Sequence, residues 1–184
     1  MQAFVPGNQP YHGPVYQGLP TLEKLRGKKP FMASLTMLKQ YNVDQIYLSD
    51  PYLSGQSLEQ FSYYIKDGII LLQGSYDDNY KSAKDPYFQE VQMCRPDISE
   101  YVVRSQYARR KIIEAIDPSN QAFRNKGSIT VDNSLAGRYE GEFEIVRKDL
   151  PSDPSVNVVG AIASEDIPLI QLIGSKQKYL IQWR

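Results

Sequence analysis

Two acidic residues stand where acid–base chemistry could take place. Asp50 follows a short β-prone segment, 45–49, and Glu23 lies beyond the β-prone segment 3–5 and a long loop. In parallel α/β proteins, the loops past the strand C-termini carry the functional residues, and a carboxyl group there can donate or accept a proton. Each residue also has a structural interpretation, Asp50 as a turn residue and Glu23 as the surface partner of Arg26. Both interpretations stay open.

One histidine and one cysteine limit the other chemistry. His12 lies in the Gly/Pro/Tyr-rich loop 6–20 and could line a site, although an ordinary loop histidine is the alternative. A single histidine excludes a multi-histidine metal site, and Cys94 alone excludes a disulfide framework or a cysteine-cluster metal site. We therefore expect no metal and no cofactor. The lone cysteine fits a reducing, cytoplasmic location.

The first part of the chain has the pattern of a parallel β/α unit. Apolar residues with helical spacing alternate with short β-prone runs, and Ser57 followed by Gln60 is a capping-box signal. A short helical turn is expected over 21–26. The order strand, helix, strand, helix, strand is predicted over 3–5, 30–41, 45–49, 57–68 and 69–73. This order predicts right-handed crossovers and a parallel sheet.

The character of the sequence changes after residue 74. A polar, Tyr/Asp-rich stretch, 75–96, is expected to be a connector, and one helix capped by Ser164 is expected over 164–173. Short β-prone segments between turn residues are predicted at 101–104, 128–131, 142–146, 156–162 and 178–183. They indicate a compact β barrel or sandwich. The expected domains are therefore 1–74 and 97–184, with the connector between them.

Charge and hydropathy exclude several partners. The 184 residues hold 21 Lys and Arg against 21 Asp and Glu, without a dense basic run. A nucleic-acid or anionic-membrane partner is therefore not expected. The longest strongly apolar run, 69–72, is far too short to span a bilayer, and residues 1–10 lack the pattern of a secretory signal.

Short motifs in a fixed order resemble those of one family. In the first part they are Phe4-Val-Pro-Gly7, Gly13-Pro14, Gly18-Leu-Pro-Thr-Leu-Glu23 with Arg26, Pro30-Phe31 and Asp50-Pro-Tyr52. In the second part they are Arg104-Ser105, Arg109, Val131-Asp-Asn133, Gly137-Arg-Tyr139, Gly141-Glu142 and Val156-Asn-Val-Val-Gly160. From about residue 3 to its end, the chain resembles the 6-phospho-N-acetylmuramidase family, whose members were long labelled outer surface proteins.

The resemblance implies a two-part fold, α/β followed by all-β. The expected architecture is a partial TIM (β/α) barrel, represented by its last three strands, and then a small cyclophilin-like β-barrel domain. Family members are considerably longer, and the earlier strands of the barrel have no counterpart here. An open barrel sector would expose a strand edge and an apolar face. Self-association, or pairing with the missing barrel half, is therefore expected.

The implied activity is hydrolysis of the β-1,4 bond in a disaccharide that carries 6-phosphorylated N-acetylmuramic acid, as in bacterial peptidoglycan recycling. Glycosidases ordinarily use two carboxyl groups, and Asp50 and Glu23 are the candidates here, although a residue of the missing strands could be the acid. We expect this chain alone to be inactive. The alternative is a non-catalytic module that binds sugar phosphate.

The resemblance also implies residues that hold the substrate. Arginine presents a fork of donors that matches phosphate. The candidates for substrate or phosphate binding are Arg104, Arg109 and Arg138, which lie in the shared motifs, together with Arg26, His12 and Tyr52. Tyr52, like Tyr11 and Tyr16, could stack on a sugar face. One departure from the family is Lys126-Gly127-Ser128, where its members usually have Arg-Gly-Asp.

Overall fold

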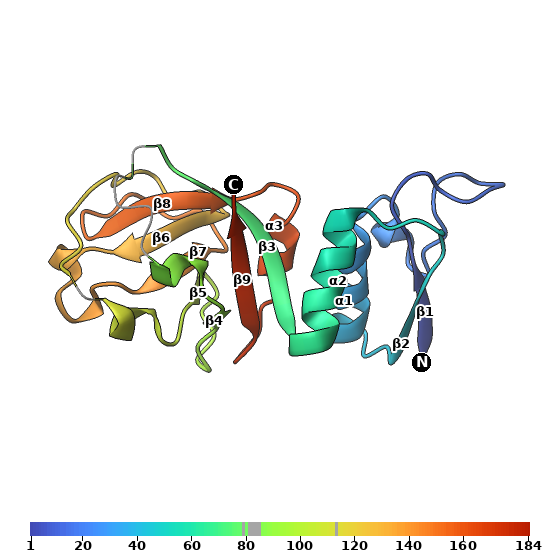
Figure 1. Cartoon of the computed structure of the whole chain (residues 1–184), viewed down its shortest axis with the longest axis horizontal. Helices are drawn as coiled ribbons and strands as arrows, with labels where there is room; N and C mark the ends of the chain where they lie inside the picture. The colour runs from blue at the N-terminus through green and yellow to red at the C-terminus, as the bar shows by residue number, and fades with distance from the viewer. Residues whose placement is uncertain (79, 81–85, 113) are drawn as a thin grey trace. The chain divides into compact units, whose positions relative to one another are not determined.

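The chain folds into two compact units, Met1–Lys66 and Asp67–Arg184, each described here by itself (Figure 1). The structure is a computed structural model, and it describes residues 1–78, 80, 86–112 and 114–184. The whole is a mixed α/β fold, with a small parallel sheet in the first unit and a seven-stranded sheet in the second. Within the described residues, no helix is long and apolar enough to cross a membrane.

The first unit is the parallel β/α arrangement that the sequence predicts. Its elements are β1 (Gln2–Val5), the 3₁₀ turn η1 (Glu23–Leu25), α1 (Pro30–Gln40), β2 (Gln45–Leu48) and α2 (Gly55–Asp67). Strands β1 and β2 pair in parallel, with Ala3 opposite Ile46 and Val5 opposite Leu48. The predicted helical turn and the predicted first helix are confirmed.

Helix α1 covers one face of this small sheet. Pro30 occupies its first turn, where a missing N–H is harmless and a fixed φ favours the helix. Ala33 and Met37 are buried in a core cluster with Ala3 and Val5 of β1. Burying side chains of this size stabilises the fold by about 1.5–3 kcal/mol for each of the larger ones. The strand β1 and the helix α1 therefore hold the intervening loop between fixed ends.

Helix α2 begins earlier than the capping signal predicts. The backbone N–H of Ser57 donates a hydrogen bond to the Oγ of Ser54 at 3.2 Å. The capping side chain is therefore Ser54 and not Ser57. Ser57 itself is buried inside the helix. The assignment of Ser57 as the cap was wrong, because two serines stand three residues apart and the sequence pattern does not choose between them.

The second unit contains one curled, half-barrel sheet of seven strands. Their order is β4-β9-β3-β8-β6-β7-β5, and β3 and β9 pair in parallel whereas the other pairs are antiparallel. The strands are β3 (Ile69–Tyr76), β4 (Gln92–Met93), β5 (Val102–Arg104), β6 (Ser128–Asp132), β7 (Phe143–Val146), β8 (Val156–Ile162) and β9 (Lys178–Trp183). The five strands predicted after residue 99 are confirmed.

Segment 69–73 was expected to be the third strand of the parallel sheet in the first part of the chain, and this prediction of its partner strands was wrong. It forms a strand, but β3 pairs with β8 and β9 of the second sheet and not with the β1–β2 sheet. Its residues Ile70, Leu71 and Leu72 are all buried, as in a central strand with neighbours on both sides. A short apolar run after a helix has the same sequence pattern whether it forms the next strand of a parallel barrel or the central strand of another sheet. The pattern therefore does not identify the partner strands.

The predicted helix over 164–173 is also shorter than expected. Helix α3 spans Ile167–Ile170, and its N-cap is Asp166 and not Ser164. The carboxylate of Asp166 accepts the backbone N–H of Gln73 at 2.9 Å, so this residue ties the helix start to β3.

Short 3₁₀ turns complete the second unit: η2 (Pro86–Gln89), η3 (Ala108–Lys111) and η4 (Ser134–Tyr139). Phe88 stacks on Phe143 of β7 with ring centroids 5.1 Å apart, which links η2 to the core of the sheet. The expected domain limits, 1–74, 75–96 and 97–184, stay predictions. Residues 79 and 81–85 of the expected connector lie outside the described residues.

Candidate functional site

The carboxylate of Asp50 is the centre of a hydrogen-bond network in the first unit. Asp50 is buried, its Oδ2 accepts the backbone N–H of Gly7 at 2.9 Å, and its Oδ1 accepts that of His12 at 2.8 Å. The Ser49 hydroxyl also donates to Oδ2, at 3.0 Å. Burial by itself would raise the pKa of Asp50, but these three hydrogen bonds outweigh it and hold the pKa below its usual range. Asp50 is therefore a stable carboxylate at neutral pH.

The loop around Asp50 is closed by backbone contacts. The N–H of Asn8 donates to the carbonyl of Tyr52 at 2.8 Å, and the Asn8 side chain accepts the N–H of Ser54 at 2.9 Å. A Cβ at Gly7 would lie 2.7 Å from the Tyr52 carbonyl oxygen, so this approach requires glycine. His12 and Tyr52 are thereby brought to the same network as Asp50, with their side chains exposed.

Glu23 and Arg26 form the surface ion pair that was one of the two interpretations of Glu23. Arg26 Nε and Nη2 donate to the two oxygens of Glu23, at 2.5 and 2.8 Å. Arg26 Nη1 also donates to the carbonyls of Gly18 and Gln17, which fixes the end of the long loop. The hydrogen bond from Arg26 lowers the pKa of Glu23. Glu23 is therefore also a carboxylate and not a proton donor at neutral pH.

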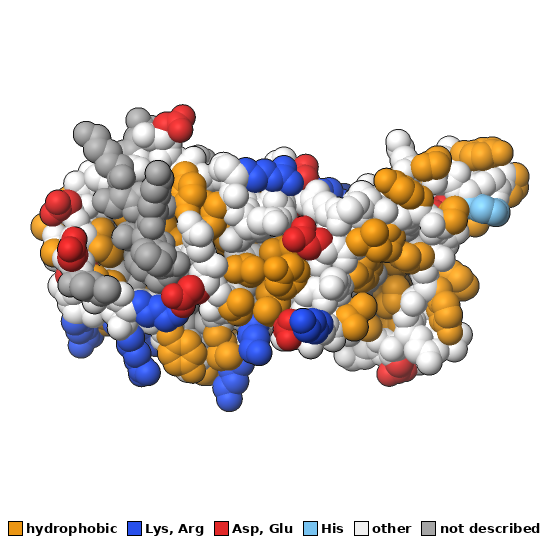
Figure 2. Space-filling view, viewed as in Figure 1, with side chains coloured by type: hydrophobic (Ala, Val, Ile, Leu, Met, Phe, Trp, Pro, Cys, Tyr) orange, Lys and Arg blue, Asp and Glu red, His pale blue; other side chains and the backbone are white. Residues whose placement is uncertain are grey.

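A second group of charged residues surrounds Glu142 in the second unit. Glu142 is buried, and its two oxygens lie 3.3 Å from Arg95 Nη1 and 2.9 Å from Arg109 Nε. Arg95 and Arg104 both pair with Asp97, at 3.1 and 2.7 Å. We call these five residues the Glu142 cluster. Figure 2 shows Lys and Arg side chains along the lower edge of this unit, with Asp and Glu side chains at separate places on its surface.

Two arginines meet at the exposed ring of Tyr139, beside the Glu142 cluster. The guanidinium of Arg138 lies 4.8 Å from the ring centroid, that of Arg109 lies 5.5 Å from it, and Arg138 Nη2 bonds the Tyr139 hydroxyl at 2.7 Å. Arg109 also donates to the Arg138 carbonyl at 3.2 Å. Among the described residues, Arg138 makes no ion pair with a carboxylate. Its charge is available for an anion.

Two further carboxyl groups have raised pKa values. Burial, with the charges of Glu142 and Asp153, raises the pKa of Asp132 to about 7. Burial, with the charges of Asp132 and Glu142, raises the pKa of Glu144 to about 7. The sequence reasoning missed both residues as candidates. For Glu144, the sequence did hold a signal of burial. This glutamate stands between the apolar residues Phe143 and Ile145, in a strand that must bury at least one face.

The predicted site residues thus fall into two groups. Asp50, His12, Tyr52 and the Glu23–Arg26 pair belong to the first unit, whereas Arg104, Arg109 and Arg138 belong to the second. In the part of the chain that the structure describes, no group of three or more His, Cys, Asp or Glu side chains is placed to hold a metal ion.

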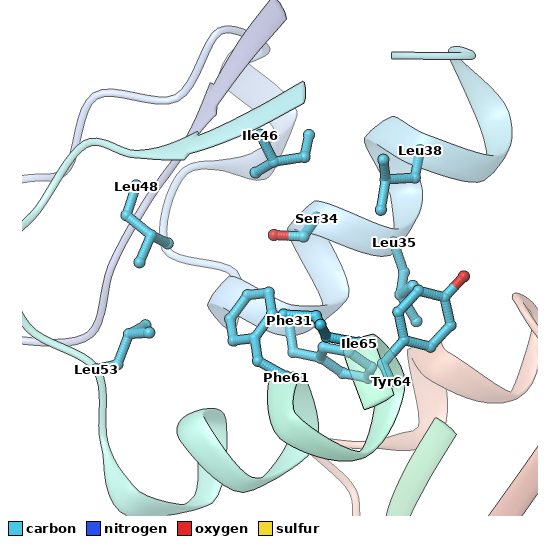
Figure 3. Close-up of a pocket in the computed structure, with 10 residues that line it drawn as sticks. All are labelled: Phe31, Ser34, Leu35, Leu38, Ile46, Leu48, Leu53, Phe61, Tyr64 and Ile65. Atoms are coloured by element: carbon cyan, nitrogen blue, oxygen red, sulfur yellow. The ribbon is translucent and has the colours of Figure 1, made fainter. Parts of the chain in front are cut away.

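A pocket of about 410 Å³ lies within the first unit, between α1, α2 and β2 (Figure 3). Its lining is almost entirely apolar, with Phe31, Leu48 and Phe61 among the side chains that face it. An apolar pocket offers few hydrogen-bond partners to a phosphorylated sugar. We therefore place the candidate polar sites at the two groups above, one in each unit, and not in this pocket.

Two family models match the chain in order, end to end. A model described as "6-phospho-N-acetylmuramidase, N-terminal" matches residues 1–63, and one described as "6-phospho-N-acetylmuramidase, C-terminal" matches residues 70–182. The chain therefore belongs to the 6-phospho-N-acetylmuramidase family. The resemblance noted from the sequence motifs is confirmed. No curated protein matches the chain.

Two solved structures are similar to the whole chain. One is a conserved Enterococcus faecalis protein of unknown function, with 31% sequence identity and a TM-score of 0.87. The match covers 100% of this chain and 49% of that protein. The other is an uncharacterised B. cereus protein, with 25% sequence identity and a TM-score of 0.79. The match covers 98% of this chain and 53% of that protein. The chain thus spans about half the length of these two proteins.

Proposed function

We propose that the chain acts in the hydrolysis of the β-1,4 bond between 6-phosphorylated N-acetylmuramic acid and N-acetylglucosamine, in the recycling of peptidoglycan in the cytoplasm. The observation that supports this is the match of both family models in order, over residues 1–63 and 70–182. For the fold, we propose that β1, α1, β2 and α2 are a sector of a TIM-type barrel. The curled sheet of the second unit would then be the cyclophilin-like domain.

The phosphate is proposed to bind at Arg138 and Arg109. Arg138 makes no ion pair among the described residues, and Arg109 lies beside it at the Tyr139 ring. Two guanidinium groups at one aromatic ring supply charge-assisted donors for a phosphate dianion. Arg109, Arg104 and Arg26 each already pair with a carboxylate, Glu142, Asp97 or Glu23. Arg138 is therefore the leading candidate, and Arg109 is preferred over Arg104 and Arg26 because it lies beside Arg138 at the Tyr139 ring.

The carboxylates of Asp50 and Glu23 fit a different part of the reaction. Both pKa values are lowered, so neither group would carry a proton at neutral pH. A glycosidase needs an ionised carboxylate as base or nucleophile and a protonated one as acid. We propose that Asp50 is the ionised carboxylate that acts as base or nucleophile, with His12 and Tyr52 beside it. Glu23 is proposed to act mainly by holding Arg26 against the loop.

The alternative is a module that binds sugar phosphate without cleaving it. What favours this alternative is that the oxygens of Asp50 and Glu23 are already occupied by hydrogen bonds from their own unit. A nucleophile or base needs a lone pair directed at the substrate or at water.

The test is to incubate the 184-residue chain with the phosphorylated disaccharide and with its unphosphorylated form, and to measure the release of N-acetylglucosamine. The proposal predicts release from the phosphorylated form only, in the presence of the part of a longer family member that this chain does not match, with a large loss in Asp50→Asn; the chain alone is expected to be inactive. Binding without release would support the non-catalytic alternative. Neither binding nor release would overturn both.

A further inference from the structure

Helix α2 of the first unit leaves much of its apolar stripe uncovered. Leu58, Phe61 and Ile65 follow one another at spacings of three and four residues, so they lie along one side of the helix. Leu58 is 54% exposed and Ile65 is 79% exposed, whereas the buried residues of α2, Ser57 and Gln60, are polar. A helix normally buries its apolar stripe against another element. The stripe of α2 is therefore available to a partner.

The apolar pocket lies beside this stripe. Figure 3 shows Ile46 and Leu48 of β2 on one side of the pocket and Phe61 and Ile65 of α2 on the other. Phe61 packs edge-on against Phe31 of α1, with ring centroids 5.4 Å apart, and this contact holds α2 against α1. The pocket, of about 410 Å³, can therefore receive apolar side chains of another segment without a rearrangement of the helices.

Strand β2 also has an unpaired edge. Among the described residues, β2 pairs with β1 alone. The N–H of Ser49 donates to the carbonyl of Val5 in β1 at 2.9 Å. Because the backbone groups of alternate residues in a strand point to opposite edges, those of Ile46 and Leu48 point away from β1. The two residues that line the pocket thus also offer backbone donors and acceptors to a further strand.

The opposite edge of the small sheet is closed. The N–H of Phe4 donates to Thr21 Oγ1 at 2.8 Å, and the N–H of Thr21 donates to the carbonyl of Phe4 at 2.9 Å. A second copy of the chain could extend β2 in parallel only through its own β1, whose outer edge Thr21 occupies. Two copies of β2 related by a two-fold axis would instead pair antiparallel.

The connection through α2 favours a parallel occupant. A strand followed by a helix ordinarily leads, by a right-handed crossover, to a parallel strand of the same sheet. Here α2 leads to β3, which belongs to the other sheet. About half of each of the two similar solved structures lies outside its match with this chain. Each of these proteins thus holds enough further chain to supply a parallel strand.

We infer that β2 and α2 bind a parallel β-strand with apolar side chains, contributed by the part of the longer proteins that this chain does not match. The backbone of that strand bonds Ile46 and Leu48, and its side chains fill the pocket, which is recognition by strand addition. The inference rests on the proposed function and deepens it, because it names the partner of the proposed barrel sector. Of self-association and pairing with the missing half, it selects the second.

The test is co-expression of the affinity-tagged 184-residue chain with the part of the Enterococcus faecalis protein that lies outside the match. We expect a soluble, equimolar complex in size-exclusion chromatography with light scattering. Hydrogen exchange then locates the contact. In the complex, the amides of Ile46 and Leu48 should exchange at least about tenfold more slowly than in the chain alone.

A charge on the stripe of α2 tests the same surface. Ile65→Lys should reduce the amount of co-purified partner at least about tenfold, because the lysine would have to be buried beside the added strand. Since Ile65 is exposed in the chain alone, the urea midpoint of the unbound variant should stay that of the wild type. The matched control is Ile98→Lys in the second unit, where Ile98 is 55% exposed, and it should retain the partner in full.

Four results would overturn the inference. The first is a partner that stays unbound or insoluble beside the wild-type chain, and the second is equal binding by Ile65→Lys and Ile98→Lys. The third is a complex that leaves the Ile46 and Leu48 amides unprotected. The fourth is a dimer of the chain alone that Ile65→Lys separates, because a second copy would then be the occupant. These readouts measure assembly and not hydrolysis, so an inactive complex would contradict the proposed function alone.

Discussion

The backbone N–H of His12 donates to the buried carboxylate of Asp50 at 2.8 Å, across 38 positions of sequence. Together with the bond from Gly7, this contact fixes the long loop after β1 to the residue that follows β2. The loop is therefore held in part by a buried charged group that bonds its backbone. This arrangement lets polar side chains such as His12 and Tyr52 stay exposed while the backbone beneath them is fixed.

The first prediction concerns this contact. Asp50→Asn removes the charge that strengthens both hydrogen bonds, and charge-assisted bonds of this kind are worth about 1.5–3 kcal/mol each. We predict that amide hydrogen exchange of Gly7 and His12 speeds up at least about tenfold. The control is Asp44→Asn, which loses only an exposed ion pair with the N-terminal amine and should leave these two amides unchanged. Unaltered exchange in Asp50→Asn would show that the loop is held by other contacts.

The second prediction concerns the buried Glu142. Glu142→Gln leaves Arg95 and Arg109 without their shared carboxylate, and removing one partner of a buried ion pair costs about 3–5 kcal/mol. Because both arginines are partly exposed, we predict a loss near the lower limit, about 3 kcal/mol. Urea unfolding followed by Trp183 fluorescence reports on this unit, since Trp183 stacks on Tyr76 at 4.0 Å.

The matched control for Glu142 is Asp97→Asn. Asp97 is also paired with two arginines, but its side chain is 56% exposed, so the loss of stability should be much smaller than in Glu142→Gln. Equal losses in the two variants would contradict the importance of burial in the Glu142 cluster.

The third prediction concerns the β3–β8 pair. A Cβ at Gly160 would lie 2.3 Å from the carbonyl oxygen of Ser75 and 2.8 Å from the ring of Trp183. Gly160→Ala should therefore push the two strands apart and destabilise the unit by about 2 kcal/mol or more. Gly174→Ala has open space around its Cβ and should change stability by less than about 0.5 kcal/mol. A Gly160→Ala protein with an unchanged urea midpoint would disprove this close approach.

The fourth prediction concerns pH. The pKa of Glu144 rises from 4.5 to about 7 on folding, so between these values the native state binds more protons than the unfolded chain. Stability from this group is present below about pH 4.5 and is lost as the pH rises through about 7. Glu144→Gln removes this dependence. We predict that the wild type loses more stability than Glu144→Gln between pH 5 and pH 8, by urea unfolding.

A parallel comparison tests whether Glu144 is specific in this respect. Glu100 is exposed, and its hydrogen bond with Lys148 lowers its pKa. Glu100→Gln should therefore follow the wild-type pH dependence over the same range. If Glu144→Gln and the wild type had the same dependence, the Glu144 carboxyl group would not be buried as described.

Much of the fold follows from local patterns in the sequence. The bounds of β8 and β9 agree with the predicted segments 156–162 and 178–183, because apolar residues bounded by turn residues define both ends. The start of α1 at Pro30 follows from the preference of proline for the first turn. The partners of β3 could not be predicted in this way. Its neighbour β9 lies more than 100 positions later, and no local signal encodes that pairing.

The candidate site was predictable in part for a similar reason. The motifs drew attention to Arg104, Arg109 and Arg138, but not to the convergence of Arg95 and Arg109 on Glu142, which depends on tertiary structure. The raised pKa values of Asp132 and Glu144 depend on burial and on neighbouring carboxyl groups. Neither quantity can be obtained from residue type alone.

The central claim is that this chain recognises a 6-phosphorylated amino sugar through Arg138 and Arg109. The most direct test is calorimetric titration of the chain with N-acetylmuramic acid 6-phosphate and with N-acetylmuramic acid. We predict at least about tenfold tighter binding of the phosphorylated sugar, a difference that Arg138→Gln removes and that the neighbouring Arg110→Gln retains. Equal affinity for the two sugars in the unaltered chain would contradict the claim.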